Sequence, residues 1–325
     1  MIYKQIGQSD LKASVVSLGT WAIGGGSWWG QNDDNESIKT IHEAIAEGIN
    51  LVDTAPVYGF GHSEEVVGKA IKDRRSNVLV STKCGLRWTD QEGSYYFSRD
   101  GRDVYKNVSK KAIKDDVEMS LRRLGTDYID VYFTHWQSVE PFLVPVSETM
   151  EALNELKKEG KIRAIGASNV TPWHIEEYVK YGQLDIIQEK YSLIDRRIEE
   201  ELLPLAKKHN ITFQAYSPLE QGLLTGKMKK DYVPEVNSAR YGKKWYQPEN
   251  LAKVVNMVEG WQDLCKKYSC TPTHLVIAWL LAQGDNVNVL CGARKTEQLE
   301  DNIKGADIIL DAADTARMRE DALAL

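Results

Sequence analysis

Seven short apolar segments each end on a polar or reactive side chain, and this pattern restricts the possible folds more than any other feature of the sequence. The segments span residues 50–53, 78–83, 128–135, 161–169, 184–190, 211–217 and 287–294. Strands that are buried on both faces of a parallel sheet read as nearly continuous apolar runs. If such strands close into a barrel, their carboxyl ends meet on the face where parallel barrels hold their active sites. We therefore expect the polar side chains to converge on one face.

Stretches with helical spacing of apolar residues lie between these segments. They cover residues 35–48, 63–71, 109–124, 146–160, 199–209, 249–268, 273–283, 296–305 and 311–323. A further helix is expected after Thr171, because Pro172 suits a first helical position. Strand and helix in alternation predict parallel strands joined by right-handed crossovers. The prediction is an α/β fold, a (β/α)8 TIM barrel, with residues 1–325 forming a single domain.

Two segments interrupt the alternation of strand and helix. Residues 85–108 and 219–248 each follow a strand, so we expect both to be long loops over the active face. The competing architecture is an open doubly wound sheet, which usually carries a GxGxxG turn. The glycines of residues 24–30 do not have that spacing, and residues 222–227 are one residue too short for a phosphate-binding loop of the GxxxxGK type. The closed barrel is therefore favoured.

The composition excludes several classes of partner. The chain has 41 Lys and Arg against 47 Asp and Glu, a net charge of −6, which argues against nucleic acid and against an anionic membrane. Residues 1–7 lack the apolar stretch of a signal peptide, and no run of about 18 apolar residues occurs. The four cysteines have no metal-ligand spacing. We expect a cytoplasmic protein without a metal; the sequence indicates no oligomeric state.

Four side chains at the ends of predicted strands match the needs of carbonyl reduction. Tyr58 could donate a proton to the carbonyl oxygen, although a free tyrosine has a pKa of about 10. Lys83 is expected to lower the pKa of Tyr58, and reaching neutrality takes on the order of 4 kcal/mol. Asp53 is the natural counter-charge for a buried lysine, and His135 could orient the carbonyl. Tyr58 and His135 would thus touch the substrate.

The motifs that carry these residues resemble the aldo-keto reductase superfamily along the whole chain. The sequence Asp-Thr-Ala-Pro-Val-Tyr-Gly at residues 53–59 matches a family signature, as do Lys83, His135-Trp136 and residues 160–169. Residues 21–26, 134–139 and 216–226 are similar to a bacterial branch that includes an NADH-dependent methylglyoxal reductase. The resemblance implies an NAD(P)H-dependent oxidoreductase that reduces small aldehydes or ketones, possible substrates being 2-oxoaldehydes of the methylglyoxal type.

The resemblance also implies where a nicotinamide dinucleotide would bind. Tyr216 would stack on the nicotinamide ring, and Asp53 would belong to the cofactor site as well as to the catalytic group. The remaining cofactor contacts, from the nicotinamide through the pyrophosphate to the adenosine, would be Gly19, Thr20, Trp21, Ser168, Asn169, Gln188, Ser217, Leu219, Gly222, Leu224, Gly292, Arg294, Lys295, Gln298 and Asn302. Trp21 would contact the substrate too.

Cofactor choice depends on one departure from the family pattern. Many relatives that use the phosphorylated cofactor carry an arginine where this chain has Gln298. Arg294 and Lys295 could hold a 2′-phosphate instead. The sequence therefore favours NADPH only slightly over NADH.

Two other functions remain open on the same barrel. The protein could be a cofactor-binding sensor or regulatory subunit with little turnover. Lys83 could instead form a Schiff base, as in barrel aldolases, although Tyr58 and Gln188 would then have no use. Trp21 and seven other aromatic residues lie in segments predicted to overhang the site, and those other than Trp21 are expected mainly to anchor their segments; they are Trp28, Trp29, Trp88, Tyr95, Tyr96, Phe97 and Tyr241. Cys84 and Cys291 are expected to act as small apolar residues.

Overall fold

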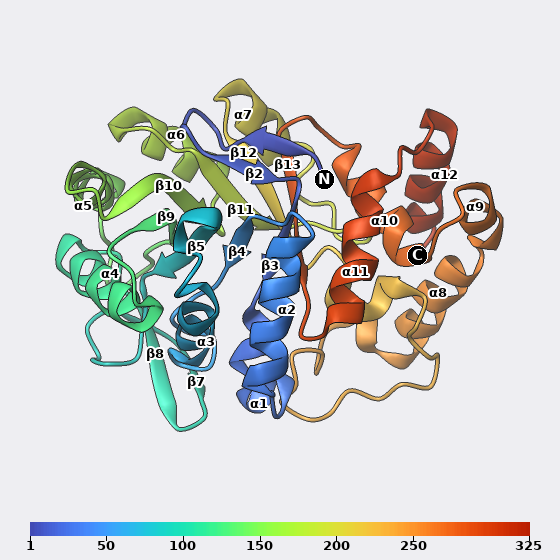
Figure 1. Ribbon diagram of the computed structural model, residues 1–325, viewed down its shortest axis with the longest axis horizontal. Coiled ribbons are helices and arrows are strands. Elements are labelled where there is room, and N and C mark those ends of the chain that lie inside the picture. Colours follow the sequence, from blue (N-terminus) through green and yellow to red (C-terminus); the bar gives the residue numbers. More distant parts are fainter.

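The computed structural model describes residues 1–325, and its centre is a closed barrel of eight parallel strands (Figure 1). The strands are β3(Val16–Gly19), β4(Leu51–Asp53), β5(Leu79–Cys84), β9(Ile129–Thr134), β10(Ile162–Ser168), β11(Ile186–Lys190), β12(Thr212–Tyr216) and β13(Val287–Gly292). Neighbours in the barrel follow chain order, and β13 closes the circle by pairing with β3 from Val289–Val16 to Gly292–Gly19. The predicted (β/α)8 barrel is confirmed.

Helices surround the barrel, and most of them begin and end close to the predicted positions. The helices are α1(Gly26–Trp29), α2(Asp34–Ala46), α3(His62–Ile71), α4(Lys110–Leu124), α5(Val146–Lys158), α6(Pro172–Tyr181), α7(Leu202–Lys208), α8(Pro248–Glu259), α9(Gln262–Lys267), α10(Pro272–Leu281), α11(Thr296–Lys304) and α12(Ala312–Leu323). Side chains of Asp33, Ser109 and Thr171 accept backbone N–H bonds as caps of α2, α4 and α6. The single helix predicted over 249–268 is wrong, because the chain breaks at Gly260 into α8 and α9.

Two small sheets lie at opposite ends of the barrel. The hairpin of β1(Tyr3–Gln5) and β2(Lys12–Ser14) covers the amino ends of the strands, at the top of Figure 1. A second sheet, formed by β6(Leu86–Arg87), β7(Ser94–Arg99) and β8(Arg102–Lys106), projects at the bottom of that view beside α1. The prediction of a loop over 85–108 is therefore wrong in part, since the segment forms antiparallel strands. Residues 219–248 contain only short 3₁₀ turns.

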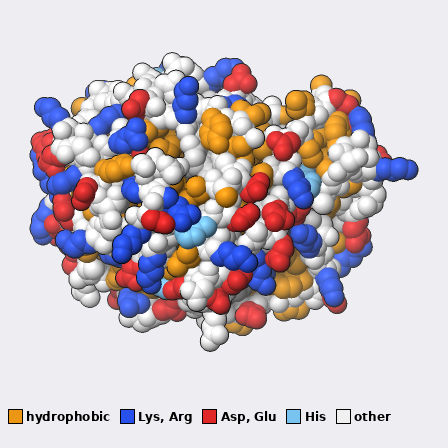
Figure 2. Space-filling view, viewed as in Figure 1, with side chains coloured by type: hydrophobic (Ala, Val, Ile, Leu, Met, Phe, Trp, Pro, Cys, Tyr) orange, Lys and Arg blue, Asp and Glu red, His pale blue; other side chains and the backbone are white.

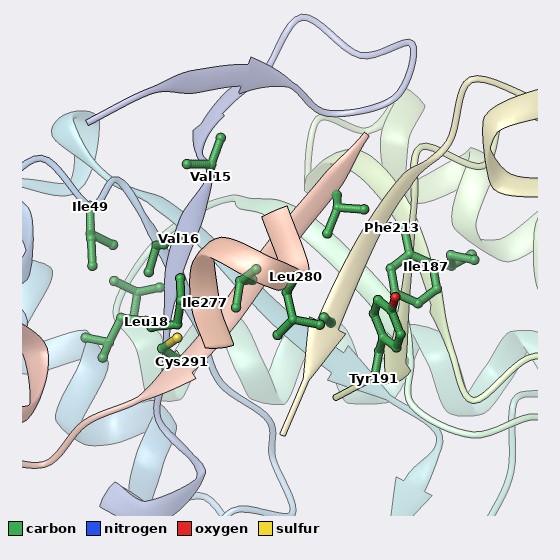
Figure 3. Close-up of a cluster of buried hydrophobic side chains, with 14 of the residues drawn as sticks. Val15, Val16, Leu18, Ile49, Ile187, Tyr191, Phe213, Ile277, Leu280 and Cys291 are labelled. Atoms are coloured by element: carbon green, nitrogen blue, oxygen red, sulfur yellow. The ribbon is translucent and has the colours of Figure 1, made fainter. Parts of the chain in front are cut away.

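The alternation of side chains along each strand divides the core into two parts. Outward residues such as Val52, Ile187 and Phe213 pack against the helices in a cluster of 68 buried residues, part of which Figure 3 shows around β3, β12, β13 and α10. Inward residues such as Leu51 and Phe133 fill the end of the barrel that the β1–β2 hairpin covers, which we call the barrel floor. The floor is thus closed, so that only the carboxyl-terminal face of the barrel remains for a site.

The surface carries Lys and Arg side chains mixed with Asp and Glu, as Figure 2 shows for one face. None of the helices has the length and apolar character that a membrane crossing requires.

Candidate active site

The carboxyl ends of the barrel strands surround a cleft of about 1440 Å³. Asp53, His135 and Gln188 reach this cleft from β4, the end of β9 and β11, and Tyr58 reaches it from the segment after β4. The other predicted residues on the cleft wall are Gly19, Trp21, Ser168, Asn169, Tyr216, Ser217, Leu219, Gly222, Gly292, Arg294, Gln298 and Asn302. The structure thus brings together most of the residues that the sequence analysis selected.

Four predicted residues do not lie on the cleft wall. Thr20 is fully buried, and its hydroxyl bonds to the Asp53 carbonyl oxygen at 2.8 Å. Leu224 belongs to the hydrophobic core, and Lys295 is an exposed residue that precedes α11. Lys83 lies beneath the wall with none of its side chain exposed. Thr20, Leu224 and Lys295 therefore do not line the cleft, whereas their chain neighbours Gly19, Trp21, Thr225 and Arg294 do.

Lys83 is held as an ion pair at the bottom of the site. Its Nζ atom lies 2.7 Å and 2.9 Å from the two carboxylate oxygens of Asp53 and 2.8 Å from the Thr54 carbonyl oxygen. These three acceptors use all three N–H groups of the ammonium. Burial lowers the pKa of Lys83, while the negative charge of Asp53 opposes that shift. The predicted role of Asp53 as the partner of Lys83 agrees with this geometry.

Tyr58 keeps its proton in this environment. Burial raises its pKa well above the ordinary value, and the nearby charge of Asp53 adds to the effect. The overall shift is therefore upward and not toward neutrality as expected, although the Lys83 ammonium lies 5.1 Å from the ring centroid, where it is paired with Asp53. A phenol that keeps its proton is what a proton donor requires.

The backbone at Tyr58 is tightly packed, since a Cβ on Gly24 would lie 2.6 Å from the Tyr58 carbonyl carbon.

His135 stands beside Tyr58 as a neutral imidazole. The two ring centroids are 5.9 Å apart at an angle of 84°. Burial lowers the pKa of His135 well below its usual value, and the positive charge of Lys83 lowers it further. A neutral imidazole carries one N–H donor, so Tyr58 and His135 together offer two neutral donors to one oxygen atom.

Asn169 connects three parts of the site. Its Nδ2 donates to the His135 carbonyl oxygen at 2.8 Å, and its Oδ1 accepts from the Tyr216 hydroxyl at 3.0 Å. Its φ of 56° lies in the left-handed region, which asparagine tolerates better than most residues. The buried carboxyl group of Glu189 accepts the next N–H, that of Val170, at 2.6 Å. The sequence analysis included Glu189 in the predicted strand 184–190 but assigned it no role, because Glu189 belongs to no recognised motif.

A chain of buried amides crosses the barrel interior to Asp53. Gln188 Nε2 donates to Asp53 Oδ2 at 3.0 Å and to Gln214 Oε1 at 2.6 Å. Gln214 Nε2 donates to Asn288 Oδ1 at 2.8 Å, and Asn288 Nδ2 donates to the Ser14 carbonyl oxygen at 2.7 Å. Because both hydrogens of the Gln188 amide are used, only Oε1 of this amide remains for a partner in the cleft.

The segment after β12 forms a second wall. Ser217 and Gln221 have φ values of 55° and 53°, and Gly222 follows at 97°. The guanidinium of Arg240 holds this turn by donating to the Gln221 carbonyl oxygen at 2.8 Å and 3.0 Å. Lys243 donates to Gln221 Oε1 at 3.0 Å. Arg240 and Lys243 both line the cleft, and sequence reasoning missed them; their signal was a pair of cations in the long segment after the predicted strand.

Arg294 and Gln298 also line the cleft. Arg294 Nη1 donates to the Trp29 carbonyl oxygen at 3.0 Å, and Gln298 Oε1 accepts the Arg294 backbone N–H at 3.0 Å. Burial lowers the pKa of Arg294, and Arg240 adds to that shift. Trp29 and Thr273 line the cleft, and each also has a buried polar atom, Trp29 Nε1 and Thr273 Oγ1, without a partner within the protein.

Aromatic rings line the part of the cleft beside Tyr58. Trp21 contacts Trp28 and Trp29 edge to face, with centroids 5.9 Å and 5.2 Å apart. Trp28 contacts Phe97 at 5.7 Å, and Phe97 contacts Tyr96 at 5.1 Å. All five line the cleft, so the expectation that only Trp21 among them contacts the pocket is wrong.

Trp136 also belongs to this aromatic wall, whereas Trp88, Tyr95 and Tyr241 lie outside the cleft, as expected of residues that do not contact the pocket. Trp136, which the sequence analysis did not count among the wall residues, lies 5.3 Å from Tyr96. Trp88 packs on Phe60 away from the cleft, and Tyr95 and Tyr241 are exposed.

These features fit an elongated polar ligand such as a nicotinamide dinucleotide. Amide groups, a tyrosine ring, the cations Arg240, Lys243 and Arg294, and a glycine with φ of 97° all lie on the wall of this cleft.

Comparison with known proteins gives matches over nearly the whole chain. The model described as the Aldo/keto reductase family matches residues 15–322. The NADH-specific methylglyoxal reductase of Escherichia coli (strain K12) is 53% identical over 322 residues, 98% of each chain. The solved structure of a glycerol dehydrogenase from Gluconobacter oxydans has a TM-score of 0.87 and 36% identity, and the match covers 99% of this chain and 94% of that one. A probable voltage-gated potassium channel subunit beta from Arabidopsis thaliana is 31% identical, over 95% of this chain and 92% of that protein.

Proposed function

The chain belongs to the aldo/keto reductase family, and from this premise we propose that it reduces small aldehydes and ketones to alcohols with a nicotinamide dinucleotide. The observation that carries the proposal is the catalytic group: a buried Asp53–Lys83 ion pair beneath two neutral donors, Tyr58 and His135, on the wall of one cleft. The cofactor, when bound, supplies the hydride for the carbonyl carbon. The chain's own residues supply the proton, the orientation and a dry environment.

Tyr58 is the proton donor in this proposal. As negative charge develops on the carbonyl oxygen, the phenol gives up its proton to that oxygen, and His135 donates a hydrogen bond that directs it. Lys83 then opposes the negative charge left on the Tyr58 oxygen, since an ammonium nearby favours the ionised form. Asp53 keeps Lys83 charged in its buried position.

The cofactor would lie along the cleft, with its carboxamide against Asn169, Ser168 and Gln188. Gln188 Oε1 would accept a carboxamide N–H, because its own N–H groups are used elsewhere. Arg294 has Nε and Nη2 without partners in the protein, so it could serve a 2′-phosphate. A slight preference for NADPH therefore stays a prediction, to be weighed against the NADH specificity in the name of the E. coli relative.

The proposed substrates include methylglyoxal, on which the E. coli relative is named as acting. The aromatic wall around Tyr58 would exclude water and pack against the carbon skeleton of the substrate. We also propose that the 325 residues act as one domain. A cytoplasmic location fits the four free cysteines, which are common in reducing compartments.

Substitution of Tyr58 by Phe tests the assignment of the proton donor. We expect kcat for methylglyoxal to fall by about 10²–10⁴-fold, since the ring remains and only the donor is lost. The affinity for NADH should stay almost unchanged. Tyr191→Phe is the matched control, because it removes a buried tyrosine hydroxyl, bonded to Glu199, that lies away from the cleft. Turnover of Tyr58→Phe equal to that of Tyr191→Phe would overthrow the mechanism.

Titration of tryptophan fluorescence with NADH and with NADPH tests the cofactor site. Quenching is expected because Trp21, Trp28 and Trp29 line the cleft, and the ratio of the two affinities gives the cofactor preference. The alternative function, a cofactor-binding regulatory subunit, is favoured by the similarity to the channel beta subunit. Tight cofactor binding without turnover of any aldehyde in a panel would establish that alternative.

A further inference from the structure

Lys106 is a buried lysine without a counter-charge. It ends strand β8 and is 8% exposed, yet no carboxylate lies within 4 Å of its ammonium group, and its side chain makes no hydrogen bond within the protein. The other buried lysine, Lys83, is paired with Asp53. Lysines are seldom buried without a partner, because the loss of hydration of the ammonium is costly. Some other interaction must therefore offset this cost.

Two aromatic rings supply that interaction. The Lys106 ammonium lies 4.1 Å from the centroid of Tyr96 and 4.6 Å from that of Trp136. Both distances are within the range of cation–π attraction, which is strongest where water is excluded. The two rings also touch each other, with centroids 5.3 Å apart. Lys106 is thus enclosed by a pair of rings.

These two rings come from different parts of the site. Tyr96 belongs to β7, in the small sheet of β6, β7 and β8, and Trp136 directly follows His135 after β9. Both line the cleft, whereas Lys106 does not. The lysine therefore lies behind the aromatic wall and joins a peripheral sheet to the catalytic segment.

We propose that Lys106 is a positioning residue for substrate selection, which holds Tyr96 and Trp136 at a fixed spacing so that carbonyl compounds with an aromatic substituent can pack between wall and Tyr58. The proposal rests on the proposed reductase function. It does not involve Lys106 in hydride or proton transfer. A small substrate such as methylglyoxal fills less of the space next to the aromatic wall, so its binding depends less on the spacing of Tyr96 and Trp136.

Lys106→Met removes the charge and keeps an unbranched side chain of similar length. We expect KM for benzaldehyde to rise about tenfold, since one to two cation–π contacts are lost, with kcat and the affinity for NADH nearly unchanged. KM for methylglyoxal should change much less. Lys106→Arg should restore a low KM for benzaldehyde, because guanidinium also stacks on aromatic rings. If Lys106→Met does not fold, Lys106→Gln gives the same comparison.

Lys180→Met is the matched control. Lys180 is an exposed residue of helix α6 whose ammonium lies 4.9 Å from the Tyr181 ring, so its loss removes a cation–π pair outside the cleft. Tyr96→Leu completes a double-mutant cycle: once the Tyr96 ring is absent, Lys106→Met should change KM for benzaldehyde much less.

The outcomes separate the proposal from its premise. Absence of turnover by the wild-type protein would refute the reductase function itself. With an active wild type, three results would each overturn the role of Lys106: equal changes in KM for both aldehydes, no rescue by Lys106→Arg, or additive effects with Tyr96→Leu. Loss of thermal stability without a change in substrate preference would reduce Lys106 to a structural residue and would also overturn the proposal.

Discussion

Glu189 gives the sharpest prediction about the pH dependence of stability. Its carboxyl group is 7% exposed and accepts the Val170 N–H, and no cation lies near enough to form a salt bridge. Burial raises its pKa from 4.5 to about 8, although the backbone hydrogen bonds to Val170 and Asn169 act in the opposite direction. The native protein therefore keeps a proton there at neutral pH that the unfolded chain has lost.

The sign and size of the effect follow from linkage. Below pH 4.5 the group is protonated in both states, so burial of the neutral acid carries no pH-dependent cost. As the pH rises from 4.5 to about 8, only the unfolded state ionises, and the free energy of unfolding falls. Roughly 3.5 pH units at about 1.4 kcal/mol each give an upper limit of about 5 kcal/mol. Above pH 8 the loss is complete.

Glu189→Gln should remove this loss while keeping an oxygen acceptor for Val170. The difference in free energy of unfolding between variant and wild type should grow from near zero at about pH 5 to several kcal/mol in favour of the variant at about pH 8.5. Urea unfolding followed by tryptophan fluorescence measures it. Burial also raises the pKa of Asp116, to about 7, but this residue is present in both proteins, so its contribution cancels in the difference in free energy of unfolding. Glu200→Gln, at an exposed site, controls for the substitution itself.

A constant difference between wild type and Glu189→Gln over this pH range would refute the reasoning, because it would mean that Glu189 titrates alike in the folded and unfolded chains. Glu189→Ala adds a second comparison. It lacks the acceptor, so it should weaken the support of Asn169 and lower the affinity for NADH at every pH, an effect that Glu189→Gln should not share.

Two further predictions concern packing. Gly24→Ala places a Cβ 2.6 Å from the Tyr58 carbonyl carbon, so kcat for methylglyoxal should fall at least tenfold while circular dichroism shows a folded protein; unchanged kcat would mean that the backbone at Tyr58 yields freely. Cys84 and Cys291 are both 2% exposed, and burial raises the pKa of Cys84 well above its ordinary value and that of Cys291 to about 12. Maleimide should therefore label only the two half-buried cysteines of the native protein and leave turnover intact, as mass spectrometry and an assay can show; labelling of either buried thiol would contradict this.

The sequence predicted the barrel because strand ends carry a strong local signal. Apolar runs that stop at Asp53, Lys83 and His135 specify where each strand stops, whatever the rest of the chain does. Strand β3 was not among the seven runs, since Val16–Gly19 is short and contains a serine. The strands β7 and β8 were also missed, because their mixed aromatic and charged residues read as a loop. Their pairing depends on partners that local sequence does not reveal.

The sequence predicted which four side chains, Asp53, Tyr58, Lys83 and His135, would come together, but it did not predict their protonation. The motifs identify Tyr58 and Lys83, but the net shift in the pKa of Tyr58 depends on how deeply the phenol is buried and on the partner that compensates Lys83. The same limit applies to Glu189 and Lys106. Their types are ordinary for a surface, and only the three-dimensional surroundings make them unusual.

The buried amides that cross the barrel have a consequence for what the cleft can recognise. Gln188 donates to Gln214, Gln214 donates to Asn288, and Asn288 donates to the Ser14 carbonyl oxygen. If any one of these amide groups were rotated by 180°, oxygen would face oxygen or nitrogen would face nitrogen. Gln188 is thereby forced to present a lone pair and no hydrogen at its end of the chain. The carboxamide of a nicotinamide dinucleotide can donate an N–H to this lone pair. The carboxylate of a nicotinic acid dinucleotide has no hydrogen to donate, and it would also be repelled by the negative charge of Asp53, which is bonded to Gln188. A chain of neutral amide side chains that ends at the barrel floor thus makes the cleft select a carboxamide ligand over a carboxylate ligand.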